Sequence, residues 1–237
     1  GLVGESGSGK STLGRTLIGL IAPDSGSVRM DGQELVGMKP RDFRPYRRQI
    51  QMVFQDPYAS LNPRHRVIEA VAQGPIAFGE NRKTALREAR ELLELVGLGG
   101  DAGDRYPHQF SGGQRQRIGI ARALALKPRL LVADEAVSAL DVSIQAQVLD
   151  LLKTVSGQFD LSVLFITHDL RVAAQICDRI AVMRQGQLVE LDRAATIFYH
   201  PQHDYTRRLI DSVPGKAWNK PDLAALSDPS TRSKQYA

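Results

Sequence analysis

The sequence predicts an α/β fold in which helices cover a mainly parallel β-sheet. Three observations in the 237 residues lead to this prediction. Apolar strand patterns alternate with helical patterns, a glycine-rich loop separates the first strand from the first helix, and a strongly apolar strand ends in two acidic residues. A chain of this length favours one domain with a subdomain.

The predicted elements follow one another in this order: helix 11–20, two short strands within 24–35, strand 50–54, a helical stretch 67–96, a helix within 110–124, a strand from 129 to the acids at 134–135, helix 143–159, a strand within 161–169, helix 170–176 and a hairpin within 179–191. The short strands are joined at Asp31-Gly32 and the hairpin turns at Gln185-Gly186, because these residue pairs favour tight turns. Pro23 disfavours helix before it, and Gly97 is expected to cap the helical stretch. We therefore expect a fold with a small antiparallel β region beside the parallel sheet and an inserted helical subdomain at about 66–125.

The composition excludes several classes of protein. Hydrophobic residues make up 42% and charged residues 24%, as in a soluble globular protein, and the apolar runs are far shorter than the ~18 residues that span a bilayer. Cys177 is the only cysteine, which excludes an internal disulfide or a cysteine-rich metal site within one chain. The net charge of +5 suits nucleic acid, a phosphate ligand or an anionic surface, but the basic residues are scattered.

The opening stretch matches a phosphate-binding loop, in which two glycines five positions apart are followed by lysine and a hydroxyl residue. Glycines let the backbone curl so that several N–H groups face one concavity at the start of a helix. Lys10 is expected to reach the β- and γ-phosphates of a nucleotide, and Ser11 to ligate Mg²⁺. The expected nucleotide-binding residues of this loop are Gly4, Glu5, Ser6, Gly7, Ser8, Gly9, Lys10, Ser11 and Thr12.

Two carboxylates follow the apolar run at 130–133. Asp134 is expected to hold Mg²⁺ through water, and Glu135 to orient or deprotonate the water that attacks the γ-phosphate. A second glycine stretch, Ser111, Gly112, Gly113 and Gln114, offers a hydroxyl and backbone N–H groups at the start of another helix. One nucleotide does not need two such phosphate sites in one chain.

At this point the sequence resembles the ATP-binding-cassette ATPases, whose signature is Ser-Gly-Gly-Gln. The resemblance implies a P-loop NTPase (RecA-like) fold and a head-to-tail dimer, in which each signature contacts the γ-phosphate bound by the other chain. It also implies roles for Gln55 near Mg²⁺ and the attacking water, Asp141 in the loop that crosses the dimer interface, and His168 as the switch histidine. Taken singly, these residues also suit a loop amide, a helix N-cap and a strand-end histidine.

Two departures from the family pattern concern the signature and the start of the chain. Phe110 stands where leucine is common, which preserves an apolar anchor. The adenine-stacking aromatic of the family precedes the phosphate loop by some two dozen residues, so we expect it, and most of the first strand, upstream of Gly1.

The stretches MVFQDPYASLNPR and EAVSALDVSIQAQVLDLL resemble the ATPase subunits of bacterial dipeptide, oligopeptide and nickel importers. The segment at about 192–215 resembles the C-terminal extension of that subfamily, with aspartate at 204 where proline is usual. We therefore expect an ATPase domain over 1–215 and a polar, disordered tail over 216–237. The alternatives are a soluble cassette ATPase that acts on ribosomes or nucleic acid, and a regulatory module that binds ATP without hydrolysis.

The importer interpretation implies that the protein hydrolyses ATP with Mg²⁺ to power uptake of peptides or a related small solute. Its expected partners are a second cassette subunit, identical or homologous, integral-membrane permease subunits and, indirectly, an extracytoplasmic solute-binding protein. Nucleic acid is not expected. The expected location is the cytoplasmic face of the inner membrane, as a peripheral subunit.

Overall fold

A computed structural model describes residues 1–56 and 61–213, and the predicted tail over 216–237 lies outside the described residues. The chain divides into two compact units. The first comprises Gly1–Leu13 and the chain from Phe165 onward, and the second comprises Gly14–Leu164. Each unit is described by itself.

The first unit is built around strand β1 (Leu2–Val3), which lies between two parallel neighbours. One neighbour is β6 (Ser162–Thr167) and the other is β7 (Arg179–Arg184), which pairs antiparallel with β8 (Gln187–Arg193). The turn between β7 and β8 lies at Gln185 and Gly186, with φ of 48° and 81°, so the predicted hairpin is confirmed. Both residues of β1 are buried, which explains the apolar start of the sequence.

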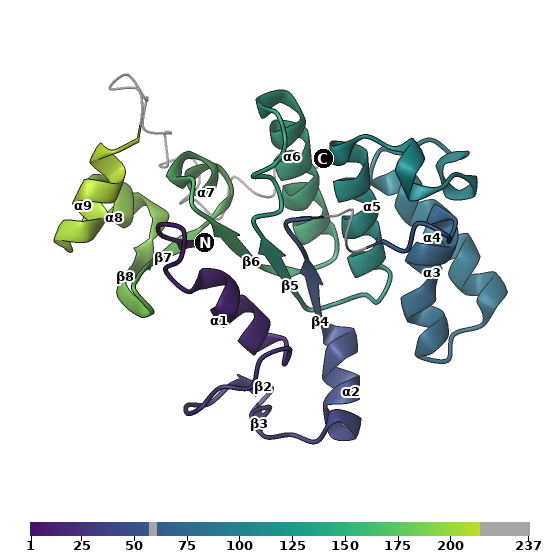
Figure 1. The fold of residues 1–237 in the computed structure, drawn as a ribbon, viewed down its shortest axis with the longest axis horizontal. Helices are drawn as coiled ribbons and strands as arrows, with labels where there is room; N and C mark the ends of the chain where they lie inside the picture. Colours follow the sequence, from purple (N-terminus) through teal and green to yellow (C-terminus); the bar gives the residue numbers. More distant parts are fainter. Residues whose placement is uncertain (57–60, 214–237) are drawn as a thin grey trace. The chain divides into compact units, whose positions relative to one another are not determined.

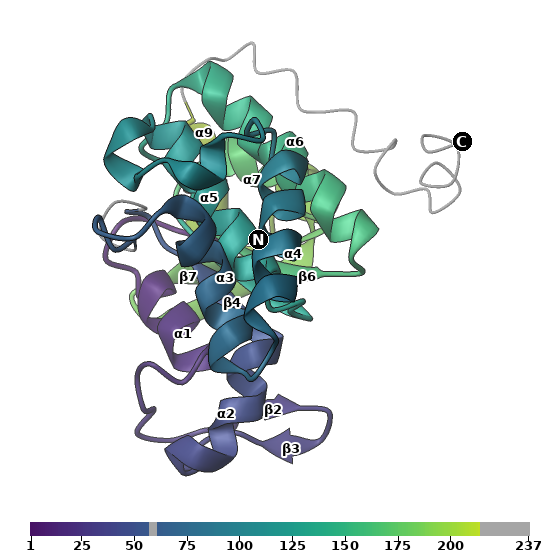
Figure 2. The same ribbon diagram turned by 90° about the vertical axis from the view of Figure 1, so that its right-hand side faces the viewer.

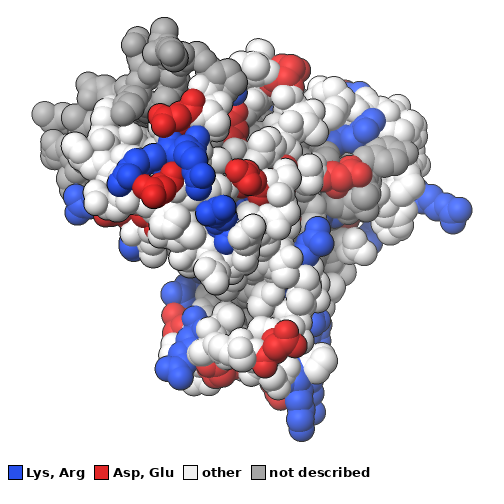
Figure 3. All heavy atoms as spheres, turned by 60° about the vertical axis from the view of Figure 1, so that its left-hand side comes forward, with Lys and Arg blue, Asp and Glu red and all other residues white. Residues whose placement is uncertain are grey.

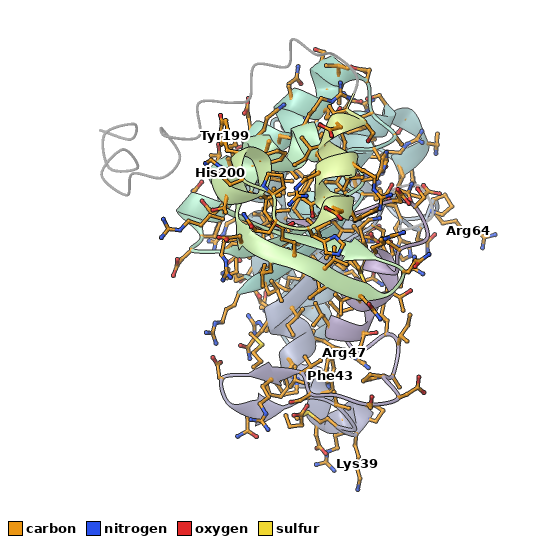
Figure 4. All side chains as sticks on the ribbon, turned by 90° about the vertical axis from the view of Figure 1, so that its left-hand side faces the viewer. Lys39, Phe43, Arg47, Arg64, Tyr199 and His200 are labelled. Carbon is orange, nitrogen blue, oxygen red and sulfur yellow. The ribbon has the colours of Figure 1, made fainter. Side chains whose placement is uncertain are left out.

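The described part of the first unit also contains helices α7 (Leu170–Ile176), α8 (Ala194–Tyr199) and α9 (Asp204–Asp211). Asp169 caps α7 by accepting the Arg171 backbone N–H, and His203 caps α9 by accepting that of Tyr205. Figure 1 shows α8 and α9 next to β8, and Figure 4 labels Tyr199 and His200 at the end of α8. Helix α1 (Lys10–Leu17) starts one residue before its predicted start at position 11. Its residues up to Leu13 belong to the first unit and the rest to the second.

The second unit contains a parallel strand pair and a separate antiparallel pair. Strands β4 (Ile50–Val53) and β5 (Leu130–Asp134) are parallel, and β2 (Arg29–Met30) and β3 (Gln33–Glu34) are antiparallel. The β2–β3 turn contains Asp31 and Gly32 at φ of 49° and 78°, as the sequence predicts. The predicted α/β class is therefore confirmed.

Helix α2 (Pro40–Gln49) is absent from the predicted elements. Its one buried side chain is Phe43, which forms a small core with Leu35 and Ile50. Figure 4 labels Phe43 and Arg47, and the Arg47 guanidinium lies 5.6 Å from the Phe43 ring centroid. Tyr46, one turn after Phe43, is partly buried and packs against the same core, so this helix is held by a short apolar face.

The other helices described in the second unit are α3 (Val67–Ala77), α4 (Arg82–Leu95), α5 (Gly112–Leu124) and α6 (Val142–Gln158), with short 3₁₀ turns at Ala102–Asp104 and Pro107–Gln109. The single helical stretch predicted over 67–96 is in fact two helices. Gly79 adopts φ of 94° between them, and Asn81 caps α4 by accepting the Lys83 backbone N–H. Figure 2 shows α3, α4 and α5 side by side, and all three contact one another.

Candidate functional site

The candidate phosphate loop connects β1 to α1 in the first unit. Three of its glycines, Gly4, Gly7 and Gly9, have φ of 154°, 81° and 100°. L-residues with side chains rarely adopt these angles, so the spacing of the glycines follows from the course of the backbone. The predicted curled loop at the start of a helix is thus present.

Lys10 is buried and is held by the loop itself. Its Nζ donates hydrogen bonds to the backbone oxygens of Gly4 and Glu5, each at 2.8 Å, and lies 3.4 Å from the Ser8 Oγ. Only 4% of Lys10 is exposed. A buried ammonium needs such acceptors, and they fix its charge beside the loop amides that a polyphosphate would contact.

Other parts of the first unit hold the loop from outside. The Gly186 N–H, in the β7–β8 turn, donates to the Ser8 carbonyl oxygen at 2.9 Å. The Glu5 N–H donates to the Tyr205 hydroxyl at 3.2 Å. The sequence did not predict a role for Tyr205, because a tyrosine in a short amphipathic helix near the end of the chain gives no signal of its distant partner.

His168 leaves the sheet beside the loop. It is exposed and directly follows β6, whose Thr167 is paired in parallel register with Val3 of β1. The loop and His168 therefore emerge from the carboxyl ends of neighbouring parallel strands. Burial raises the pKa of the adjacent Asp169, but hydrogen bonds from Arg171 lower it more, so the net pKa lies below its usual value.

In the second unit, Asp134 is the last residue of β5, the position that the sequence predicts, and only 3% of it is exposed. Glu135 follows and contacts another predicted site residue. The Gln55 Nε2 lies 3.4 Å from the Glu135 Oε2, although 80 positions separate them. The structure thus brings together two of the residues expected near an attacking water.

Glu135 also has a strained backbone, with φ of 47°. A non-glycine residue in the left-handed region is uncommon, and such strain tends to occur at functional sites. The Ser138 backbone N–H and hydroxyl both donate to the Glu135 carbonyl oxygen, at 3.1 Å and 3.0 Å. These bonds hold the turn that follows the strand.

The second glycine stretch caps α5. The Ser111 Oγ accepts the Gln114 N–H at 3.3 Å, and the Gln114 side chain accepts the Ser111 N–H at 3.0 Å. This reciprocal pair is a capping box. Gly112 starts the helix, and Gly113 is buried. Phe110, the apolar residue before the box, is 4% exposed.

Asp141 has an ordinary structural role in the second unit. Its Oδ1 accepts the Ile144 N–H at 2.9 Å and caps α6. The arginines of α5 also serve the local fold, since Arg115 donates to the Pro107 carbonyl and Arg117 to that of Val96. Two of the scattered basic residues are therefore used in internal hydrogen bonds.

The residues of the loop fit a nucleotide. Lys10 supplies positive charge, and an alanine Cβ at Gly7 would meet nothing within 4 Å, so the loop is open at that position. The expected metal ligands Ser11, Gln55 and Asp134 offer oxygen atoms, which Mg²⁺ prefers. Within the described residues, no three His, Cys, Asp or Glu side chains form a metal site.

On the face shown in Figure 3, Lys and Arg side chains lie among those of Asp and Glu. No described helix is long and apolar enough to cross a bilayer. Cys177 is buried, and burial raises the pKa of its thiol.

Comparison with known families gives one match that covers more than half of the chain. The sequence model of the ABC transporter family matches residues 1–138. This range includes the phosphate loop, Gln55, the signature and the two acids at the end of β5.

Curated relatives match over most of the chain. The dipeptide transport ATP-binding protein DppF of Lactococcus lactis subsp. cremoris is 51% identical over 218 residues, which cover 90% of this chain and 70% of the relative. A putative peptide import ATP-binding protein of Brucella abortus is 52% identical over 217 residues, covering 90% of this chain and 65% of the relative. The chain thus spans about two thirds of the length of these relatives.

Solved structures share the fold. The ATP-binding cassette MJ0796, in a dimeric post-hydrolysis state bound to ADP and phosphate, has a TM-score of 0.73 and 30% identity over 81% of this chain and 84% of that chain. The protein cbiO1 from Clostridium perfringens, part of the ABC transporter complex cbiONQ, has a TM-score of 0.76 and 25% identity over 90% of this chain and 83% of that chain.

Proposed function

The chain belongs to the ABC transporter family, and we propose that it is the ATP-binding and ATP-hydrolysing subunit of a bacterial importer of peptides or a related small solute. The observation that carries the proposal is its 51% identity, over 90% of its length, to a dipeptide transport ATP-binding protein. The peptide import relatives favour this function over a soluble cassette that acts on ribosomes or nucleic acid.

In this proposal the phosphate loop binds the nucleotide as Mg·ATP. Lys10 and the loop amides neutralise phosphate charge, and Ser11 ligates Mg²⁺, while Gln55 and Asp134 place the ion less directly. The buried, hydrogen-bonded state of Lys10 supports its part. Bound Mg²⁺ supplies charge neutralisation of the phosphates.

Glu135 positions the attacking water, and His168 contacts the γ-phosphate. The contact between Gln55 and Glu135 supports their action on one water molecule, and the register of β1 and β6 supports the place of His168 beside the loop. The nucleotide of a partner cassette is contacted by the signature stretch and the interface loop of this chain, namely Ser111, Gly112, Gly113, Gln114 and Asp141. Because this chemistry is mostly positioning and electrostatics, single groups carry large effects.

The proposed partners are a second cassette subunit, identical or homologous, a membrane permease, and a solute-binding protein that acts through the permease. Closure of the two cassettes around ATP drives the permease, and hydrolysis reopens them. The subunit then works as a peripheral protein at the cytoplasmic face of the membrane. The solved dimer of a related cassette supports the pairing of two subunits.

The test is Glu135→Gln in the full-length protein. We expect ATP binding to be retained and ATP hydrolysis to fall by about 10²-fold or more, with closed dimers accumulating in ATP on size-exclusion chromatography. Glu91→Gln, which removes an exposed carboxylate from α4, is the matched control and should hydrolyse ATP normally. A Glu135→Gln variant that hydrolyses ATP at the wild-type rate would refute the assignment.

A further inference from the structure

Tyr205, in the first turn of α9, contacts the phosphate loop through its hydroxyl group. The hydroxyl accepts the Glu5 backbone N–H at 3.2 Å across 200 positions of the chain. Only 4% of Tyr205 is exposed, so the ring is packed within the first unit. The contact joins helix α9 to the beginning of the phosphate loop.

The ring lies next to the hairpin that also holds the loop. The Arg184 guanidinium lies 5.1 Å from the Tyr205 ring centroid, a distance at which a cation and an aromatic face attract each other. Arg184 is the last residue of β7, two positions before Gly186, whose N–H donates to the Ser8 carbonyl. Hairpin and tyrosine thus hold the loop at two different peptide groups.

The backbone that carries Tyr205 is fixed by β8. The Glu190 carboxylate accepts the backbone N–H groups of Gln202 at 2.8 Å and His203 at 3.1 Å. Partial burial raises the pKa of Glu190, but hydrogen bonds from Gln202, then Thr206 and His203, lower it more, so the pKa lies below its usual value. The His203 Nδ1 in turn accepts the Tyr205 N–H at 3.0 Å.

On the premise of the proposed function, we propose that Tyr205 is a positioning residue of the phosphate loop, which it holds ready for the nucleotide phosphates by orienting the Glu5 peptide. A partly buried N–H that loses its partner costs free energy. A loop that can relax without this partner must be ordered again when ATP binds, which weakens affinity. Helix α9 thereby contributes to the nucleotide site.

The test is Tyr205→Phe in the full-length protein, which removes the hydroxyl and keeps the ring. We expect ATP and ADP to bind about 3- to 10-fold more weakly, the range of one hydrogen bond. In steady-state assays the KM for ATP should rise by a similar factor while kcat changes by less than about 2-fold, since the loop contact is the same in ground state and transition state.

Tyr199→Phe is the matched control. Tyr199 ends α8 in the same segment, is 40% exposed, and is labelled at the surface in Figure 4. This variant should bind ATP like the wild type. If Tyr205→Phe lowers the unfolding midpoint but leaves the ATP affinity of the folded protein unchanged, Tyr205 has a structural role alone and the proposal is overturned.

The variant Lys10→Ala distinguishes a failure of the positioning role of Tyr205 from a failure of the proposed ATP-binding function. If the wild type binds ATP and Lys10→Ala does not, the phosphate loop works as proposed, and wild-type affinity in Tyr205→Phe would overturn the positioning role alone. If the wild type binds no ATP, or Lys10→Ala binds it equally well, the proposed function fails and the role of Tyr205 fails with it.

Discussion

The phosphate loop and the stretch Ser111 to Gln114 have similar compositions, and both lead into a helix, but their glycines are needed for different physical reasons. In the phosphate loop, Gly4, Gly7 and Gly9 all have φ in the range that side chains disfavour. In the second stretch, no positive φ occurs at Gly112 or Gly113. The first loop needs glycine for its backbone path.

The second stretch needs glycine for packing. A Cβ at Gly113 would lie 2.3 Å from the Ile144 Cγ2, whereas one at Gly112 would come no closer than 3.9 Å to Leu140. Ser111 supplies the cap of α5 in place of a curled backbone. A glycine-rich motif before a helix is therefore not evidence of one common loop shape, and substitutions should separate the two cases.

The largest effect is expected at Gly4, where both reasons apply. Its φ is 154°, and a Cβ would lie 2.1 Å from the Met183 carbonyl oxygen, a backbone atom that cannot move alone. Gly4→Ala should lower the free energy of unfolding by about 3 kcal/mol or more. Urea unfolding without nucleotide measures it, with Gly112→Ala as the matched control, expected within about 0.5 kcal/mol of wild type. Equal midpoints in the two variants would contradict this ranking.

A smaller effect is expected at Gly113, where packing alone is at stake. Gly113→Ala should cost about 2 kcal/mol, because the β-branched Ile144 side chain is stiff and cannot move aside freely. Ile144→Ala removes the opposing methyl group, so the double variant should recover at least half of that loss in a double-mutant cycle. Purely additive losses would show that contact with Ile144 is not the cause.

The smallest effect is expected at Gly7, where only the backbone angle matters. Its φ is 81°, and a Cβ would meet nothing within 4 Å. Gly7→Ala should cost about 1 kcal/mol, and Gly7→Asn less, because asparagine tolerates the left-handed region. At Gly113 the order should reverse, since asparagine is larger than alanine. Unfolding midpoints of the four variants test this reversal of the order of alanine and asparagine. The same order at both positions would contradict the distinction between a glycine needed for its backbone angle and one needed for packing.

Most of the fold could be predicted because its determinants are local. The turns at Asp31-Gly32 and Gln185-Gly186 follow from residue pairs that accept positive φ. Helix α2 could not be predicted in this way, because it contains Pro45 and buries only Phe43. The break between α3 and α4 carried signals in Gly79 and Asn81, but the apolar pattern continues across it.

The sequence by itself determined the phosphate loop, since its glycines, Lys10 and Ser11 lie within one short segment whose backbone angles those residues set. It also determined the acidic end of β5. Only the tertiary structure decided that Gln55 contacts Glu135 and that Tyr205 contacts Glu5, across 80 and 200 positions. Hydrogen bonds of about 3 Å between such distant residues depend on strand register and helix packing, which no local pattern of residues specifies.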